Sequence, residues 1–260
     1  MTKSTNTVEQ EPAVSRRQIV MAAAGIATAG VIFTWFSARS RPTTAADGPL
    51  VRPGRAKKLP PEQLAKELAK AGPLPEIIVG KEDAPVTIVE YADLTCPACG
   101  AFHKTVLPQL KEKYIDTGKV RILFREFPTT WPALLAVMTV RCAGAEKAWP
   151  LVSALFARQD DWRGLASNPD QFREKLFSFG QQVGLTRQTF DNCTPAIRDG
   201  KLDFSTPTQK KLLEDIVTVR NRAHETFSVS STPTFFINGK RLPHATIEEF
   251  ERVLAPLVTP

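Results

Sequence analysis

Residues 86–103 constrain the fold more than any other stretch of this 260-residue chain. They read V-T-I-V-E-Y-A-D-L-T-C-P-A-C-G-A-F-H, so a run rich in β-branched residues leads into two cysteines separated by two residues. Residues such as Val86 and Ile88 favour a buried strand. Thr95 stands where a side-chain oxygen can cap a following helix. The stretch therefore predicts a strand that delivers a cysteine pair onto the N-terminus of a helix.

The place of this cysteine pair predicts redox chemistry. Cys96 is expected among the first residues of the helix, where unpaired backbone N–H groups and the positive end of the helix dipole stabilise a thiolate. A lowered thiol pKa makes a cysteine a good nucleophile and a good leaving group in thiol–disulfide exchange. Cys99 follows one helical turn later, close enough to form a reducible disulfide with Cys96. Pro97 suits the first turn because its missing N–H would have no intrahelical partner there.

Other uses of a C-x-x-C pair fit this chain less well. A zinc site needs more ligands, but Cys142 and Cys193 stand alone and His103 is the only nearby imidazole. A c-type haem requires histidine directly after the second cysteine, where this chain has Gly100. We therefore expect no metal and no cofactor. An inert structural disulfide, or metal delivery by the pair together with His103, stays open as an alternative.

The N-terminal region has the features of an export signal. Arg16 and Arg17 precede an uncharged, mostly small or apolar run that ends at Ala38, which resembles a twin-arginine signal. Residues 1–46 are interpreted as a cleaved signal peptide or as an anchor that crosses the inner membrane through residues 18–38. In both cases the folded part lies in the periplasm, where disulfides persist.

The formal net charge of +7 is partly local, because residues 47–60 form a basic linker that contains proline and glycine. No aromatic residues are interleaved with these charges, so we expect no nucleic-acid partner. Residues 61–71 carry leucines at helical spacing and predict a short helix. A helix of this length is marginal as a self-associating stalk. We expect it to dock on the main domain, which leaves the protein a monomer.

Residues 61–260 are expected to form one α/β domain with a helical insertion. The first strands are expected at residues 77–79, 85–92 and 120–127. A helix from Cys96 to about Thr117, bent at Pro108 and stopped at Gly118, connects the second and third of these strands. A right-handed crossover of this kind places the two strands in parallel.

Helical patterns fill an insertion over about residues 129–226. The expected helices lie around Cys142 and at residues 150–159, 168–183, 186–192 and 207–223. Strand character returns at residues 232–240, where Asn238-Gly239 is a strong hairpin signal. The segment from Thr246 carries a capping box and an apolar stripe, which predict a final helix that covers the sheet.

This order of elements, with C-P-A-C on a helix and T-P-T-F-F-I-N-G before the final helix, resembles the DsbA family of thiol:disulfide oxidoreductases, in its alphaproteobacterial type. The resemblance covers about residues 72–260 and implies a thioredoxin-like fold with an inserted α-helical domain. It implies that Cys96 is the exposed nucleophile and Cys99 its buried partner. Pro233 matches the family's cis-proline, and Thr232 before it would offer backbone groups to an extended substrate.

Glu90 corresponds in this resemblance to the family's buried acid, which would relay the proton of Cys99 during exchange. A glutamate exposed at the edge of a strand is the alternative. Pro97 and Ala98, between the cysteines, are expected to contact substrate. Ala98 replaces a histidine that the strongly oxidising members carry. Because that imidazole stabilises the thiolate of Cys96, its loss predicts a weaker oxidant.

Cys142 and Cys193 both fall in the insertion. An even number of cysteines in an exported protein argues for a second, structural disulfide, and a similar bridge is known among alphaproteobacterial relatives. Two buried free thiols are the alternative. The pattern and the resemblance together predict an exported enzyme that introduces disulfides into reduced or unfolded proteins. The resemblance alone implies that a membrane partner of the DsbB type reoxidises it. The alternatives are an isomerase or reductase kept reduced by a membrane donor, and a non-catalytic peptide-binding or chaperone module.

Overall fold

The central strand of the sheet is β2 (Val86–Ala92), the buried strand that the sequence predicts. The computed structural model describes residue 50 and residues 59–258. In it, β2 pairs in parallel with β3 (Val120–Glu126) and antiparallel with β6 (Thr234–Ile237). All residues of β2 except one are buried, as expected for a strand that is covered on both faces.

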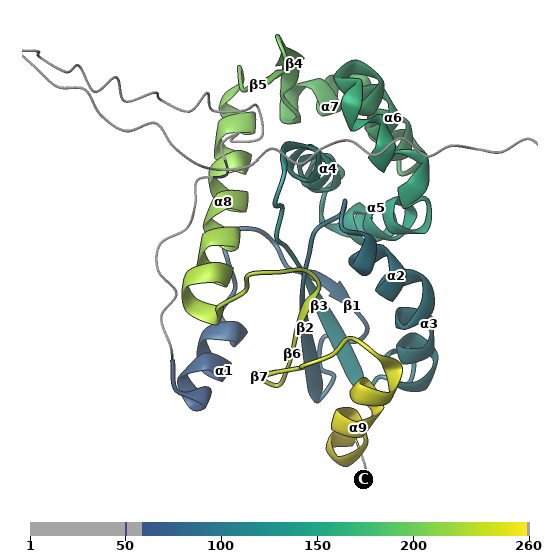
Figure 1. The fold of residues 1–260 in the computed structure, drawn as a ribbon, viewed down its shortest axis with the longest axis vertical. Coiled ribbons are helices and arrows are strands. Elements are labelled where there is room, and N and C mark those ends of the chain that lie inside the picture. The colour runs from purple at the N-terminus through teal and green to yellow at the C-terminus, as the bar shows by residue number, and fades with distance from the viewer. Residues whose placement is uncertain (1–49, 51–58, 259–260) are drawn as a thin grey trace, which may run out of the picture. The chain divides into compact units, whose positions relative to one another are not determined.

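Two short strands complete the sheet, whose order is β1-β3-β2-β6-β7 (Figure 1). β1 (Ile77–Val79) pairs antiparallel with β3, and β7 (Lys240–Arg241) pairs antiparallel with β6. The predicted hairpin turn between β6 and β7 is confirmed, because Asn238 and Gly239 both have positive φ angles, 44° and 86°. This mixed sheet with helices on both faces is the thioredoxin-like α/β arrangement predicted from the sequence.

Helices cover the two faces of the sheet, with α1 and α8 on one side and α2, α3 and α9 on the other (Figure 1). Their bounds are α1 (Pro61–Ala69), α2 (Pro97–Thr105), α3 (Leu107–Leu110), α8 (Pro207–Phe227) and α9 (Ile247–Val258). Val89 and Tyr91 belong to the core that α8 closes with Phe227. Ile88 belongs to the core that α2 closes with Phe102. Because side chains alternate along a strand, residue 90 faces the α2 side.

α1 docks on the main body of the chain, as predicted. Leu64 and Leu68 pack in the same core as α8. Arg222 of α8 donates to the carbonyl oxygens of Glu67 at 2.6 Å and of Lys70 at 3.2 Å. A basic side chain on the last carbonyls satisfies acceptors that a helix C-terminus leaves without partners. The apolar face of α1 is therefore buried within its own chain.

The helix after the cysteine pair is interrupted, and the prediction of one bent helix is wrong. α2 ends at Thr105, and Pro108 stands in the first turn of a new helix, α3. Proline in a first turn removes no intrahelical hydrogen bond, so a fresh start is more favourable than a proline inside one long helix. A π-helical turn, η1 (Lys111–Ile115), follows. Gly118, with φ +77°, ends the segment as predicted.

Helices dominate the chain between β3 and β6, as predicted. Those before α8 are α4 (Trp131–Cys142), α5 (Ala145–Ala157), α6 (Pro169–Gln182) and α7 (Arg187–Cys193), with the short 3-10 turns η2 (Gln159–Asp161) and η3 (Arg163–Ser167). α5 begins at Ala145 and not at Pro150, which lies inside it. Gly144, with φ +86°, provides the sharp turn that lets α5 start directly after α4.

The insertion also contains a hairpin that the sequence analysis missed. β4 (Ala196–Arg198) and β5 (Lys201–Asp203) pair antiparallel around Asp199 and Gly200. Both turn residues have positive φ angles, 50° and 70°. Asp-Gly is a hairpin signal in its own right, but the flanking segments lack the β-branched run that identifies a strand.

The predicted signal peptide or anchor, residues 1–46, and its apolar span, residues 18–38, lie outside the described residues, as does most of the linker at residues 47–60. Within the part of the chain that the structure describes, no helix is both long enough and apolar enough to cross a bilayer. Export and anchoring therefore stay predictions.

Candidate active site

Cys96 is the N-cap residue of α2, at the end of the loop that follows β2. Its extended backbone, φ −71° and ψ 122°, leads into Pro97 at the first helical position. The Cys96 amide donates to the carbonyl oxygen of Asp93 at 3.0 Å, which fixes the turn. The prediction that Thr95 caps the helix is wrong, because its hydroxyl donates to a carboxylate oxygen of Asp93 at 2.6 Å. Cys96 therefore takes the capping position with its sulfur beside the free N–H groups of the first turn.

The two thiols of the pair have opposite electrostatic environments. Hydrogen bonds from the side chains of Cys99 and Thr232, and from the backbone N–H groups of Cys99 and Ala98, lower the pKa of Cys96 to about 5. Burial raises the pKa of Cys99, which has no exposed surface, and the charge of Glu90 raises it further. At neutral pH Cys96 is therefore a thiolate and Cys99 a thiol. Both are free cysteines in the structure.

The chain brings a second segment, 136 residues further on, against the cysteine pair. The peptide bond between Thr232 and Pro233 is cis, in the loop that leads into β6. In its thiol form Cys96 donates from Sγ to the Thr232 carbonyl oxygen at 3.3 Å. Pro97 and Ala98 are exposed, whereas Thr232 and Pro233 are half-buried. Thr232 thus borders Cys96, while substrate binding by Pro97, Ala98, Thr232 and Pro233 stays a prediction.

Glu90 lies on the buried face of β2 with no exposed surface, so it is not a glutamate at an exposed edge. One carboxylate oxygen, Oε1, is 3.0 Å from Nε2 of His103, and the other has no hydrogen-bond partner among the described residues. The His103 ring stacks on Phe156 of α5 with centroids 3.9 Å apart. His103 is thereby held on the carboxylate in a buried pair. Glu90 acts on Cys99 electrostatically, because its charge disfavours a thiolate at Cys99.

From the sequence, His103 was considered only as the nearby imidazole that could join the cysteine pair in metal delivery, and its pairing with Glu90 was missed. The signal was present, because Cys99 and His103 are four residues apart and share one face of α2. Glu90 faces the same side of the sheet. Across the described ranges, 50 and 59–258, no three His, Cys, Asp or Glu side chains are grouped so that they could hold a metal ion.

Asp93 is a second residue of the site that sequence reasoning missed. It is buried, and each of its two carboxylate oxygens accepts two hydrogen bonds. One oxygen accepts from the amide and hydroxyl of Thr95, and the other from the amide and hydroxyl of Thr129, at 2.6 to 2.9 Å. Four donors satisfy the buried carboxylate completely. Asp93 therefore ties the cysteine loop to the first residues of the insertion.

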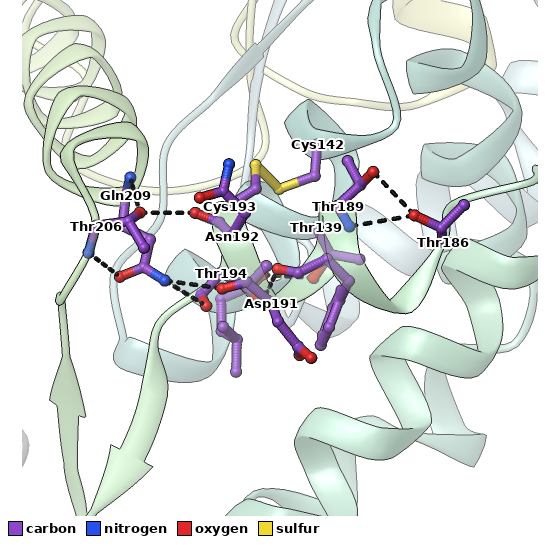
Figure 2. Close-up of a disulfide and its surroundings, with 12 residues drawn as sticks. Thr139, Cys142, Thr186, Thr189, Asp191, Asn192, Cys193, Thr194, Thr206 and Gln209 are labelled. Atoms are coloured by element: carbon purple, nitrogen blue, oxygen red, sulfur yellow. Dashed lines mark hydrogen bonds between the residues drawn. A yellow bond between two sulfur atoms is a disulfide. The ribbon is translucent and has the colours of Figure 1, made fainter.

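The remaining two cysteines form a disulfide in the insertion (Figure 2). It joins Cys142, at the end of α4, to Cys193, at the end of α7, with a Cα–Cα distance of 5.9 Å. The bridge closes a sequence separation of 51 residues. Thr206 and Gln209 lie beside it at the start of α8 (Figure 2). The bridge holds together helices that belong to the insertion and leaves Cys96 and Cys99 as the free pair.

Comparison with known proteins gives a family model described as thioredoxin that matches residues 74–255. The chain belongs to the thioredoxin family. This thioredoxin-family protein is 29% identical over 180 residues to a putative protein-disulfide oxidoreductase of Rickettsia bellii, which covers 69% of this chain and 63% of the relative. A relative of the same description from Rickettsia typhi is 28% identical, over 69% of this chain and 60% of its own length. The chain thus spans about three fifths of the length of these curated relatives.

Among solved structures, the thioredoxin-family protein is similar to alpha-DsbA1 of Wolbachia pipientis. The TM-score is 0.60 at 29% identity, and the match covers 75% of this chain and 96% of alpha-DsbA1. These findings confirm the recognition of a DsbA-type protein and the thioredoxin-like fold class, both made from the sequence.

Proposed function

We propose that the protein is an exported thiol:disulfide oxidoreductase that introduces disulfides into reduced proteins of the periplasm. The observation that carries this proposal is that the two thiols have opposite pKa shifts and therefore opposite protonation states at neutral pH. Cys96 is half-buried with a pKa lowered to about 5, and Cys99 is fully buried with a raised pKa. A thiolate stabilised in the reduced protein makes the disulfide form a stronger oxidant. The similarity to putative protein-disulfide oxidoreductases supports the same reading.

The exchange transfers two electrons from a substrate dithiol to the cysteine pair. A substrate thiolate attacks Sγ of Cys96, the bond to Cys99 breaks, and the Cys99 sulfur takes up a proton. A second substrate thiolate then attacks the substrate sulfur of the mixed disulfide, and Cys96 leaves as a thiolate. The low pKa of Cys96 favours this second step because a more acidic thiol is the better leaving group.

Glu90 and His103 are suited to move the proton that Cys99 gains and loses. The pair is buried, and one Glu90 oxygen has no hydrogen-bond partner among the described residues. Burial makes a charged Cys99 thiolate costly, so a proton donor and acceptor beneath it lowers the barrier to exchange. In the proposal Glu90 passes the proton to and from Cys99, and His103 holds the carboxylate in place.

Substrates are proposed to bind as extended segments at the edge of the pair. The exposed Pro97 and Ala98 lie on one side of Cys96, and Thr232 with the cis-linked Pro233 lies on the other. Backbone groups of Thr232 would pair with the substrate chain. This recognition is largely independent of substrate side chains, as required of an enzyme that acts on many reduced or unfolded proteins.

The remaining parts of the proposal concern export, reoxidation and oligomeric state, and they rest on the predicted export signal, on the resemblance to the DsbA family and on the docking of α1. Residues 1–46 would direct the chain to the periplasm through the twin-arginine route or anchor it in the inner membrane, and a DsbB-type membrane partner would reoxidise the reduced pair. The protein is proposed to act as a monomer. The buried apolar face of α1 supports this, because the N-terminal helix is already occupied by its own chain.

An isomerase or reductase kept reduced by a membrane donor is the second candidate. Threonine before the cis-proline, here Thr232, favours it, because isomerases also carry threonine at that position. A third candidate, a peptide-binding or chaperone module, would use the same groove without exchange. Replacing Cys96 with serine separates this third candidate from the first two, because a binding function would survive the loss of the thiol.

The deciding experiment is the equilibrium reduction potential of the pair, measured against glutathione on the purified protein. The Cys96 pKa of about 5 lies about 1.5 units above the ~3.5 of the most acidic DsbA thiol, and about 1.5 units correspond to about 45 mV. Starting from about −120 mV for that DsbA, we expect about −165 mV. A value near thioredoxin's, about −270 mV, would contradict the oxidase proposal and favour the reductase or isomerase.

A further inference from the structure

Gln159 of the insertion reaches the loop that carries Cys96. It opens η2, shortly after α5, and only 3% of the residue is exposed. Its amide nitrogen Nε2 donates to the carbonyl oxygen of Leu94 at 2.8 Å and to that of Cys96 at 2.9 Å. A primary amide has two N–H donors, so both are used on this loop. Leu94 is fully buried, and its carbonyl would lose this donor without the glutamine.

The glycine that follows Cys99 fits this contact. A Cβ added at Gly100 would lie 2.4 Å from Oε1 of Gln159 and 2.9 Å from its Cδ. Glycine is less favourable than alanine inside a helix, so its place in the first turn of α2 needs a reason. The close approach of the Gln159 side chain provides that reason. Gly100 and Gln159 are therefore two parts of one contact.

The contact bears on the sulfur of Cys96 through the shape of the loop. The Cys96 carbonyl oxygen also accepts from the amide of Gly100 at 3.1 Å, so two donors hold it in place. The thiolate is stabilised by N–H groups of Ala98 and Cys99, which belong to the same turn. If the loop shifts, the directions of these N–H groups change, and hydrogen bonds weaken steeply when they are misaligned.

We propose that Gln159 is a positioning residue for the redox pair, through which the insertion holds the Cys96 loop in the shape that favours the thiolate. The insertion thereby takes part in setting the potential of the pair. The proposal rests on the proposed function, since it assumes that Cys96 and Cys99 undergo reversible exchange.

The test replaces the amide with side chains of similar size. In Gln159→Met both donors are lost, and in Gln159→Glu the carboxylate also places an acceptor against the two carbonyls. We expect the equilibrium constant for oxidation of glutathione by the disulfide form to fall by about tenfold in Gln159→Met, which equals about 30 mV toward reducing values. The Cys96 pKa, measured by thiolate absorbance at 240 nm, should rise in the same variant and rise further in Gln159→Glu.

Gln209 provides a matched control in the same insertion (Figure 2). It is 1% exposed, and its Nε2 also donates to two backbone carbonyls, those of Asp191 and Thr194, each at 3.0 Å. These carbonyls lie beside the structural disulfide and not beside the redox pair. Gln209→Met should therefore lower the melting temperature while the potential and the Cys96 pKa stay at wild-type values.

Equal potentials for wild type and Gln159→Met, with only stability lost, would overturn the proposal, as would equal shifts in Gln159→Met and Gln209→Met. If Gln159→Met does not fold, Gly100→Ala displaces the glutamine by one methyl group and should shift the potential in the same direction. No shift in Gly100→Ala would then count against the proposal. A wild-type pair that does not equilibrate with glutathione would refute the proposed function instead, so the two failures are distinguishable.

Discussion

Removing the structural disulfide should weaken the fold by an amount that follows from its place in the chain. Cys142→Ala combined with Cys193→Ala opens a loop that spans a sequence separation of 51 residues and contains α5 and α6. In the chain-entropy model, closing about fifty residues stabilises the folded state by about 4 kcal/mol at 25 °C. A typical domain is stable by only about 5 to 15 kcal/mol, so the double variant should stay folded with little stability in reserve.

The assay is urea unfolding of the oxidised protein and of the double variant, followed by far-UV circular dichroism. With a slope of about 2 kcal/mol per molar urea, the transition midpoint should fall by about 2 M. The control is Cys96→Ser combined with Cys99→Ser, which keeps the structural bridge and should unfold near the wild-type midpoint. A loss below about 1 kcal/mol in the Cys142/Cys193 variant would refute the reasoning, because it would mean that the bridge restrains little in the unfolded chain.

Three further predictions concern the redox site. Alkylation of Cys96 in the reduced protein should be half-maximal near pH 5. Because the folded pKa lies below the ordinary 9.0, the stability that the thiolate adds to the reduced protein is lost as pH falls through about 5. A titration midpoint above pH 8 in the thiolate absorbance at 240 nm would contradict this prediction. Glu90→Gln should slow exchange in stopped-flow fluorescence by about tenfold or more, with the Cys96 pKa little changed, because proton transfer at Cys99 is affected; an unchanged rate excludes the relay. Asp93→Asn should lower the free energy of unfolding by about 1 to 3 kcal/mol in urea titration, because an amide nitrogen then faces N–H and O–H donors. An unchanged free energy of unfolding would mean that the hydrogen bonds from Thr129 contribute nothing to stability.

Local sequence patterns predicted the parts of the fold that depend on neighbours in the chain. β2 follows from its β-branched residues, the turn at Asn238-Gly239 from the need for positive φ angles, and helix α1 from its spaced leucines. The break between α2 and α3 was misread, because Pro108 is compatible with a bend and with a fresh helix start. Only packing of the flanking segments decides between these two outcomes.

The candidate site was also predicted only in part, because some of its contacts join residues that are far apart in the chain. Cys96, Cys99 and the cis-linked Pro233 belong to motifs that can be recognised in the sequence. The partners of these residues are harder to identify, because a buried aspartate or glutamine reads in sequence as an ordinary polar residue, and Glu90 was assigned only through the resemblance to the DsbA family. His103 meets Glu90 across 13 positions, Thr129 meets Asp93 across 36, and Gln159 meets the cysteine loop across 63 and 65. Such contacts depend on the folded topology, which local patterns do not encode.

The four hydrogen bonds on Asp93 bear on how this architecture can be altered. Thr129 is the point where the chain leaves the sheet for the inserted helices, and its bonds end on the same carboxylate that shapes the turn before Cys96. The insertion is therefore not an interchangeable module. A chimera that keeps this sheet and accepts a foreign helical segment after β3 needs both a backbone N–H and a hydroxyl at the position of Thr129, or a buried carboxylate oxygen loses one or both of its donors next to the turn that carries the reactive sulfur.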